Sequence, residues 1–112
     1  MQGRYKVITI CGSTRFKDDF IKAQEDLTLK GFIVISVVFF GHSDKKYDNL
    51  LTDKVKEMLD DMHKRKIDMA DEIYVINRDG YIGSSTRSEI EYANKTGKKV
   101  NYMYNSGKEP SA

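Results

Sequence analysis

The chain has 112 residues, the size of one domain, which is enough to bury roughly two thirds of the unfolded surface around one core. Its 19 basic and 17 acidic residues leave a net charge of +2, too balanced to indicate a nucleic-acid polymer or a membrane surface as the partner. The single cysteine, Cys11, excludes an internal disulfide, and no cysteine and histidine cluster has zinc spacing. With no signal segment or long apolar run, the sequence predicts a cytoplasmic protein without metal or cofactor that binds a small molecule.

The first third of the chain has the pattern of a strand, a helix and a second strand. Residues 5–11 (YKVITIC) are β-branched and apolar with little alternation, which is typical of a parallel strand covered on both faces. Apolar residues at helical spacing from Phe16 predict a helix that stops at Gly31. A second apolar stretch, residues 32–40, then predicts another buried strand.

The middle of the chain predicts a loop, a long helix and a third strand. Residues 41–49 are polar without a period, and residues 51–69 carry apolar side chains on one helical face. We interpret the methionines of that face as core filler. Residues 72–77 (EIYVIN) predict the third strand.

The last part of the chain predicts a helix that runs through Ile90 and Ala93 to a stop at Gly97, a fourth strand at residues 99–104, and a loose tail at residues 105–112. Strands that alternate with helices imply parallel pairing. The expected fold is therefore a single α/β domain over residues 1–104, Rossmann-like (flavodoxin-like), with about four to five parallel strands flanked by helices.

In open parallel sheets, ligands bind outside the carboxyl ends of the strands. This rule selects residues 12–15, 39–44 and 77–89 as candidate ligand-binding segments. The first contains Gly12, Ser13, Thr14 and Arg15, where backbone N–H groups, two hydroxyls and a guanidinium can converge on a phosphate. The alternative is an ordinary turn with Ser13 or Thr14 as a helix N-cap. We interpret Cys11 as a buried residue at the strand end rather than a nucleophile.

The third segment leads into Glu89, the candidate catalytic centre. Glycines bracket a polar loop there, and the phosphate-binding candidates within it are Gly83, Ser84, Ser85 and Thr86. A carboxylate in the first turn of a helix suits electrostatic or nucleophilic work on an electron-poor carbon. Equally, Thr86 and Glu89 fit a capping box in which Glu89 only ties back to the helix start. Glu91 points about 200° away from Glu89 and is expected to be exposed.

Other polar residues have both a functional and a structural interpretation. Asp68 and Asp71 close the long helix, where the helix dipole disfavours a carboxylate, so one is a functional candidate unless each is a turn residue. His63 is either a proton donor or an ordinary residue on a helix flank. Phe40 and His42 lie where a planar base would stack.

Three motifs, ICGSTR, MADEIYVIN and GSSTRSEIEYANKTGKKV, together resemble the nucleoside 2-deoxyribosyltransferase superfamily, and most of all its 2'-deoxynucleoside 5'-monophosphate N-glycosidases. The similarity spans about residues 5–104. It implies that Glu89 attacks or stabilises the anomeric carbon, that Ser13 and Arg15 belong to the phosphate turn, and that Asp71 matches an Ala-Asp pair before the third strand. His63 stands at the position that matches a catalytic aspartate of the family, with Asp60 and Asp61 nearby.

The sequence departs from the family pattern at two further positions. Thr9 stands where relatives carry a tyrosine that orients the glutamate, and Gly83 stands where they tend to have Asp or Ser. The resemblance implies N-glycosidic cleavage of nucleoside 5'-monophosphates, by hydrolysis or transfer, in a homodimer or larger assembly. A catalytically weak nucleotide-binding sensor and a flavodoxin-like mononucleotide carrier are the alternatives.

Overall fold

Four parallel strands form one sheet in the part of the chain that the computed structural model describes, residues 2–36 and 48–104. The strands are β1 (Val7–Cys11), β2 (Ile33–Ser36), β3 (Glu72–Val75) and β4 (Lys99–Tyr102). Their spatial order is β2-β1-β3-β4, and every neighbouring pair is parallel. This is the order in which a flavodoxin-like sheet begins. The expected α/β, Rossmann-like fold is confirmed.

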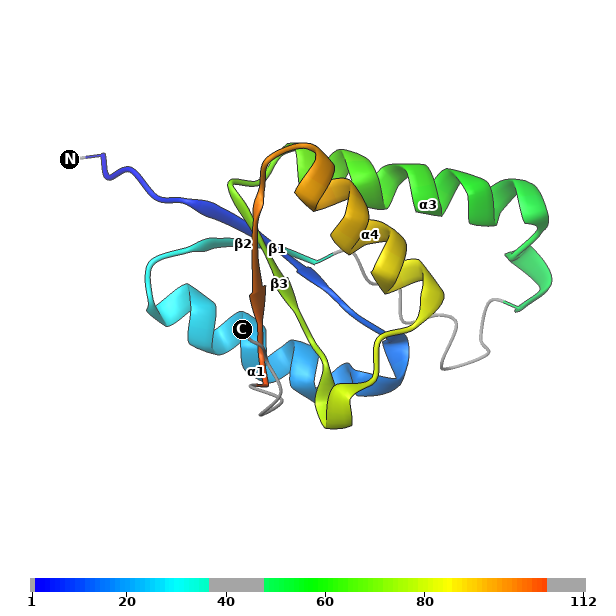
Figure 1. Ribbon diagram of the computed structural model, residues 1–112, viewed down its shortest axis with the longest axis horizontal. Coiled ribbons are helices and arrows are strands. Elements are labelled where there is room, and N and C mark those ends of the chain that lie inside the picture. The colour runs from blue at the N-terminus through cyan, green and yellow to red at the C-terminus, as the bar shows by residue number, and fades with distance from the viewer. Residues whose placement is uncertain (1, 37–47, 105–112) are drawn as a thin grey trace.

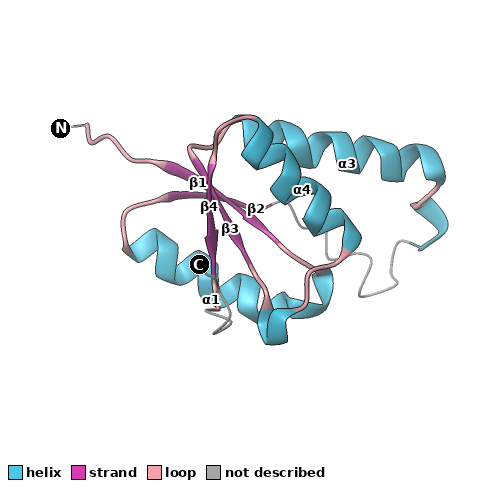
Figure 2. Cartoon of the chain, viewed as in Figure 1, coloured by secondary structure: helices cyan, strands magenta, loops and turns pink. Residues whose placement is uncertain are grey.

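Helices cover both faces of the sheet, as Figures 1 and 2 show. The helices among the described residues are α1 (Lys17–Leu29), α3 (Asp53–Asp68) and α4 (Ser84–Lys95). Three single 3₁₀ turns, η1 (Thr14–Phe16), η2 (Asp48–Leu50) and η3 (Arg78–Gly80), precede or link these elements. α1 lies on one face, and α3 and α4 lie on the other (Figure 2).

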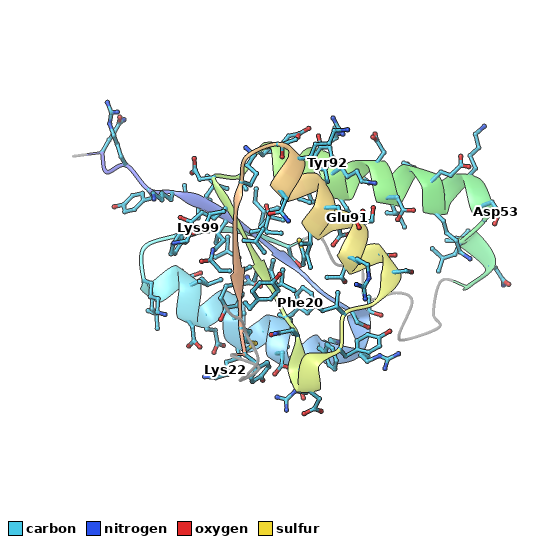
Figure 3. All side chains as sticks on the ribbon, in the orientation of Figure 1. Phe20, Lys22, Asp53, Glu91, Tyr92 and Lys99 are labelled. Atoms are coloured by element: carbon cyan, nitrogen blue, oxygen red, sulfur yellow. The ribbon has the colours of Figure 1, made fainter. Side chains whose placement is uncertain are left out.

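Two hydrophobic clusters explain this layering, because successive side chains of a strand point to opposite faces. Toward α1 the core consists of Ile8, Ile10, Phe20, Ala23, Leu27 and Ile76. Toward α3 and α4 it consists of Cys11, Ile67, Ile73, Val75 and Ala93. Figure 3 shows Phe20 of α1 beside the sheet. Apolar residues on both faces of β1 and β3 account for the weak alternation of the sequence there.

The interpretation of the methionines as core filler is wrong. Met58, Met62 and Met69 are all exposed, and Ile67 is the buried residue of α3. For Met58 the reason can be followed in Figure 1: the N-terminal half of α3, to which this residue belongs, extends beyond the edge of the sheet and has no sheet to cover. Helical periodicity identified an apolar face but did not show how much of the helix lies over the sheet.

Both predicted helix stops are confirmed by backbone geometry. Gly31 follows α1 with φ of 96°, and Gly97 follows α4 with φ of 78°, a region that glycine adopts without steric cost. β1 begins at Val7, two residues later than predicted. Residues 37–40 of the predicted second strand and the predicted tail at residues 105–112 lie outside the described residues. No helix in the described part of the chain is both long and apolar enough to cross a membrane.

Candidate functional site

A cavity of about 370 Å³ opens at the carboxyl edge of the sheet, between the ends of β1 and β3 and the helices α3 and α4. It brings together most of the predicted site residues, although they come from distant parts of the sequence. Its described lining consists of Gly12, Ser13, Thr14, Lys56, Leu59, Asp60, His63, Tyr81, Gly83, Ser84, Ser85, Thr86 and Glu89.

The floor of the cavity begins at the turn after β1. Gly12 is required by close packing, since a Cβ there would lie 3.0 Å from Cβ of Ile76 and 3.3 Å from the ring of Phe20. The hydroxyl of Ser13 accepts a hydrogen bond from the backbone N–H of Arg15, at 3.3 Å, and so caps η1. The N-cap interpretation is therefore confirmed for Ser13, whose hydroxyl still lines the cavity.

Arg15 is not among the described residues that line the cavity. Its exposed guanidinium stacks over the ring of Tyr81, 4.2 Å from the ring centroid, as a cation–π contact. Phe16 meets the same ring edge-on, with the centroids 5.9 Å apart. Tyr81 itself lines the cavity and was not predicted, although an aromatic residue between two glycines of a polar loop is a signal that could have identified it.

The wall opposite the turn is the start of α4. The N-cap residue is Gly83, and no side chain caps the helix. Ser84 and Ser85 are exposed in the first turn and line the cavity, whereas Thr86 is buried. Thr86 is therefore not the N-cap, the position that the capping-box alternative requires of it. The first backbone N–H groups of an α-helix have no intrahelical partner, and here no side chain caps them.

Glu89 is buried in the second turn of α4 and faces His63 of α3. Nδ1 of His63 lies 3.3 Å from Oε2 of Glu89, yet it has no hydrogen-bond partner among the described residues because the angles of the contact depart from those of a hydrogen bond. The carboxylate thus packs against α3 and does not reach back to the helix start. The capping-box interpretation is wrong, and Glu91 is exposed as expected, where Figure 3 labels it on α4.

Cys11 lies beneath Glu89 at the end of β1. Burial raises the pKa of the Cys11 thiol well above its usual value, and the charge of the Glu89 carboxylate and its hydrogen bond with the thiol raise that pKa further. A neutral thiol that donates to the carboxylate is the state these effects favour. Cys11 is a buried residue at the strand end, as predicted, and the raised pKa opposes a role as nucleophile.

One face of α3 supplies further cavity residues, of which the sequence had indicated only Asp60 and His63. Lys56, Leu59 and Asp60 line the cavity together with His63, at the spacing of neighbours on one helical face. Asp61 instead lies 3.6 Å from Arg65 in an exposed ion pair. A smaller hollow of about 210 Å³ adjoins the cavity and shares Asp60, Ser84, Ser85 and Glu89 with it; its further described lining residues are Lys64 and Ser88.

The structure does not bring Asp71 or Asp68 to the cavity. Asp71 lies at the amino edge of the sheet, where its carboxylate accepts a hydrogen bond from the backbone N–H of Val7 at 2.8 Å. Asp68 accepts one from the hydroxyl of Tyr92 at 2.6 Å, between α3 and α4. Both carboxylates thus have structural partners. Phe40 and His42, the predicted base contacts, lie outside the described residues.

A second polar cluster lies at the carboxyl edge, apart from the cavity, and was not predicted. The guanidinium of Arg78 donates two hydrogen bonds to the Asp19 carboxylate, both at 2.8 Å, and a third to the hydroxyl of Tyr104 at 2.8 Å. The side chain of Asn77 exchanges two hydrogen bonds with the backbone of Tyr104, each at 2.9 Å. The hydrogen bonds from Arg78 lower the pKa of Asp19 against the opposing effect of burial. This cluster ties α1 to the end of β4.

Comparison with known proteins adds no assignment: no family model matches the chain, and a search of curated proteins gives no match. Within residues 2–36 and 48–104, no group of three histidine, cysteine or acidic side chains is placed to hold a metal ion. The site is therefore characterised by its geometry alone: a buried carboxylate with few donors, at the wall of a cavity lined by hydroxyls and glycine turns.

Proposed function

We propose that the protein cleaves the N-glycosidic bond of nucleoside or deoxynucleoside 5'-monophosphates, by hydrolysis or by transfer to another base, with Glu89 as the nucleophile. The observation that carries this proposal is the position of Glu89. It is buried, it lines a cavity large enough for part of a nucleotide, and its described polar contacts are one imidazole and one thiol. The resemblance of the three sequence motifs to the nucleoside 2-deoxyribosyltransferase superfamily agrees with this chemistry.

The reaction places positive charge on the sugar. As the bond between the anomeric carbon and the base nitrogen breaks, the electron pair leaves with the base, which takes a proton from an acid. A Glu89 oxygen forms an ester with the anomeric carbon, and water or a second base then displaces the carboxylate. His63 is the acid in this scheme because its ring lines the cavity beside Glu89. The proposed reaction gives no role to Asp61, which forms an ion pair with Arg65, or to Asp71, whose carboxylate accepts a hydrogen bond from Val7.

The phosphate of the substrate would lie between the turn after β1 and the start of α4. Ser13 and Thr14 line the cavity on one side, and Ser84 and Ser85 line it on the other. Hydroxyls and uncapped backbone N–H groups suit phosphate oxygens, and an anion at a helix N-terminus is stabilised by the helix dipole. Gly12 belongs to the same turn and lines the cavity beside these hydroxyls.

A second candidate, a nucleotide-binding sensor with little or no turnover, is favoured by two observations. The His63–Glu89 contact departs from hydrogen-bond geometry, so the carboxylate is not firmly oriented by this residue. The hydroxyl of Thr9 donates to the carbonyl of Lys66 at 3.0 Å and is thereby engaged elsewhere. Such a module would bind nucleotides in the same cavity without releasing base.

The deciding experiment incubates the protein with common nucleoside and deoxynucleoside 5'-monophosphates and measures free base by chromatography. Release of base by the native protein, and its absence with Glu89→Gln, supports the glycosidase. Binding of a monophosphate without release of base supports the sensor. Neither binding nor release by the native protein contradicts both proposals.

We further propose a cytoplasmic homodimer or larger assembly. The support for self-association is the apolar side chains exposed along α3, among them Met58 and Met62. Light scattering at micromolar concentration, with Met58→Glu as the variant, measures the assembly. A monomeric native protein would contradict this proposal and leave the proposed chemistry untouched.

A further inference from the structure

The charge balance of the cavity presents a problem for an anionic ligand. Two of the residues that line it, Asp60 and Glu89, carry carboxylates. Glu89 is buried, so its repulsion of a phosphate is only weakly screened, and the exposed Asp60 adds a second, better-screened negative charge. Hydroxyls and backbone N–H groups alone would have to offset both charges, so a phosphate that enters this cavity needs a cation among the lining residues.

The sequence-based candidate for that cation was Arg15, but the structure stacks its guanidinium over the ring of Tyr81, 4.2 Å from the centroid, and Arg15 is not among the described residues that line the cavity. The permanent cation among the described lining residues is instead Lys56 of α3. Within the described part of the chain, its ammonium forms no ion pair, although Asp60 follows at a distance of four residues. Within the described residues, no carboxylate thus occupies the Lys56 ammonium.

The position of Lys56 relative to the reacting group also suits this role. Lys56 and His63 are seven residues apart, about 10 Å along the helix at 1.5 Å per residue, and both line the cavity. His63 contacts Glu89, so the ammonium approaches the cavity from one end of this helical face and the reactive carboxylate stands at the other. A ligand that spans the cavity can thus present its glycosidic bond to Glu89 and its charged group to Lys56.

We propose that Lys56, rather than Arg15, is the residue that makes the cavity select phosphorylated ligands over neutral ones. This inference rests on the proposed function for the identity of the ligand, a nucleoside 5'-monophosphate. Lys56 binds the phosphate as a mobile point charge, and its hydrocarbon stem lies along the wall formed by α3. Arg15 acts through Tyr81, whose ring it holds against the turn after β1.

The test compares Lys56→Gln with Lys54→Gln, an exposed lysine on the same helix that does not line the cavity. Calorimetric titration with a deoxynucleoside 5'-monophosphate and with the matching nucleoside measures the preference for phosphate. Lys56→Gln should weaken binding of the monophosphate roughly tenfold to a hundredfold, because one charge-assisted contact is lost. It should leave the affinity for the nucleoside within about twofold of the native value. Lys54→Gln should change neither affinity, and Lys56→Arg should restore most of the preference.

Each outcome decides between possibilities. Equal effects of the two glutamine variants, or equal weakening of both ligands by Lys56→Gln, overturn the role of Lys56. If Arg15→Gln loses the preference for the monophosphate while Lys56→Gln keeps it, Arg15 is the residue that selects phosphorylated ligands. If the native protein releases free base but Lys56→Gln keeps the preference for the monophosphate, only the role of Lys56 is overturned. If binding of the monophosphate depends on Lys56 but no base is released, only the glycosidase activity is overturned. A native protein that binds neither ligand overturns both.

Discussion

Asp19 and Glu89 are two carboxylates buried to the same extent, with 5% and 6% of the residue exposed, yet their surroundings differ. Asp19 accepts two hydrogen bonds from Arg78 at 2.8 Å and one from the hydroxyl of Tyr104 at 3.1 Å. Glu89 has the imidazole of His63 at 3.3 Å, outside hydrogen-bond geometry, and the thiol of Cys11.

Burial of a carboxylate carries a desolvation cost that only donors or opposite charges can offset. For Asp19 the fold supplies these donors, so the group stabilises the native state. For Glu89 the fold supplies few donors, and it places the group on a cavity wall where a ligand can supply the rest. The number of donors, rather than the depth of burial, therefore separates a structural carboxylate from a candidate catalytic one.

The largest expected effect is on turnover in Glu89→Gln. The amide has nearly the same shape but cannot neutralise a developing sugar cation, so release of base should fall at least about a hundredfold. The free energy of unfolding should change by less than about 1 kcal/mol, because a carboxylate with few donors contributes little to stability. Kinetics and urea unfolding of the same preparation measure both. Turnover within about threefold of native would show that Glu89 is not the nucleophile.

Asp19→Asn should have the opposite profile. It removes the charge from three hydrogen bonds, so the free energy of unfolding at pH 7 should fall by about 2 kcal/mol, while turnover stays within about threefold because Asp19 does not line the cavity. The measurement is urea unfolding monitored by circular dichroism. A variant as stable as the native protein would mean that the cluster of Asp19, Arg78 and Tyr104 does not hold α1 in place.

The comparison of the native protein with Asp19→Asn also predicts how their difference in stability depends on pH, an effect of smaller size. The pKa of Asp19 is lowered in the folded state, chiefly by its hydrogen bond with Arg78, so its stabilising effect is present above the unfolded pKa of about 4 and is lost as the pH falls through the folded value. The stability difference between native protein and Asp19→Asn should thus be constant near neutral pH and shrink below about pH 4. A difference that grows on acidification would contradict the assigned pKa direction.

The smallest expected effect concerns Cys11. Because burial and the neighbouring Glu89 carboxylate raise the pKa of its thiol, iodoacetamide should modify the native protein very slowly at pH 8 and the urea-unfolded chain readily. Glu89→Gln removes the second cause of the raised pKa but not the first, so it should accelerate the reaction only slightly. Mass spectrometry follows the modification. Fast alkylation of the native protein would show that the thiol is accessible.

The fold was predictable because its signals are local. Apolar runs mark β1 and β3, and Gly31 and Gly97 stop two helices as expected. The rule that ligands bind at the carboxyl edge identified Gly12 and Glu89, which the structure places on one cavity. These features depend on backbone propensity and on strand order, both of which the sequence pattern carries.

What the sequence could not indicate depends on tertiary placement. Lys56 lines the cavity from the half of α3 that extends past the sheet, a placement that no periodicity predicts. The stacking of Arg15 on Tyr81 and the pairing of Asp19 with Arg78 join segments that approach each other only in the folded chain. A charged residue at a turn shows that a partner is needed, but not which one.

The extension of α3 past the sheet also has a consequence for how the site can vary. The helix α3 carries three cavity residues, Lys56, Asp60 and His63, and its C-terminal end is anchored in the core by Ile67. Glu89 belongs to a different helix, α4. No residue of the projecting half belongs to the two described core clusters, so its side chains can be exchanged without direct loss of core packing and without a change at the candidate catalytic carboxylate. A small tilt of α3, by contrast, would shift all three of these side chains at once. α3 is thus both the easiest part of the site to diversify and the one whose angle the rest of the fold must hold fixed.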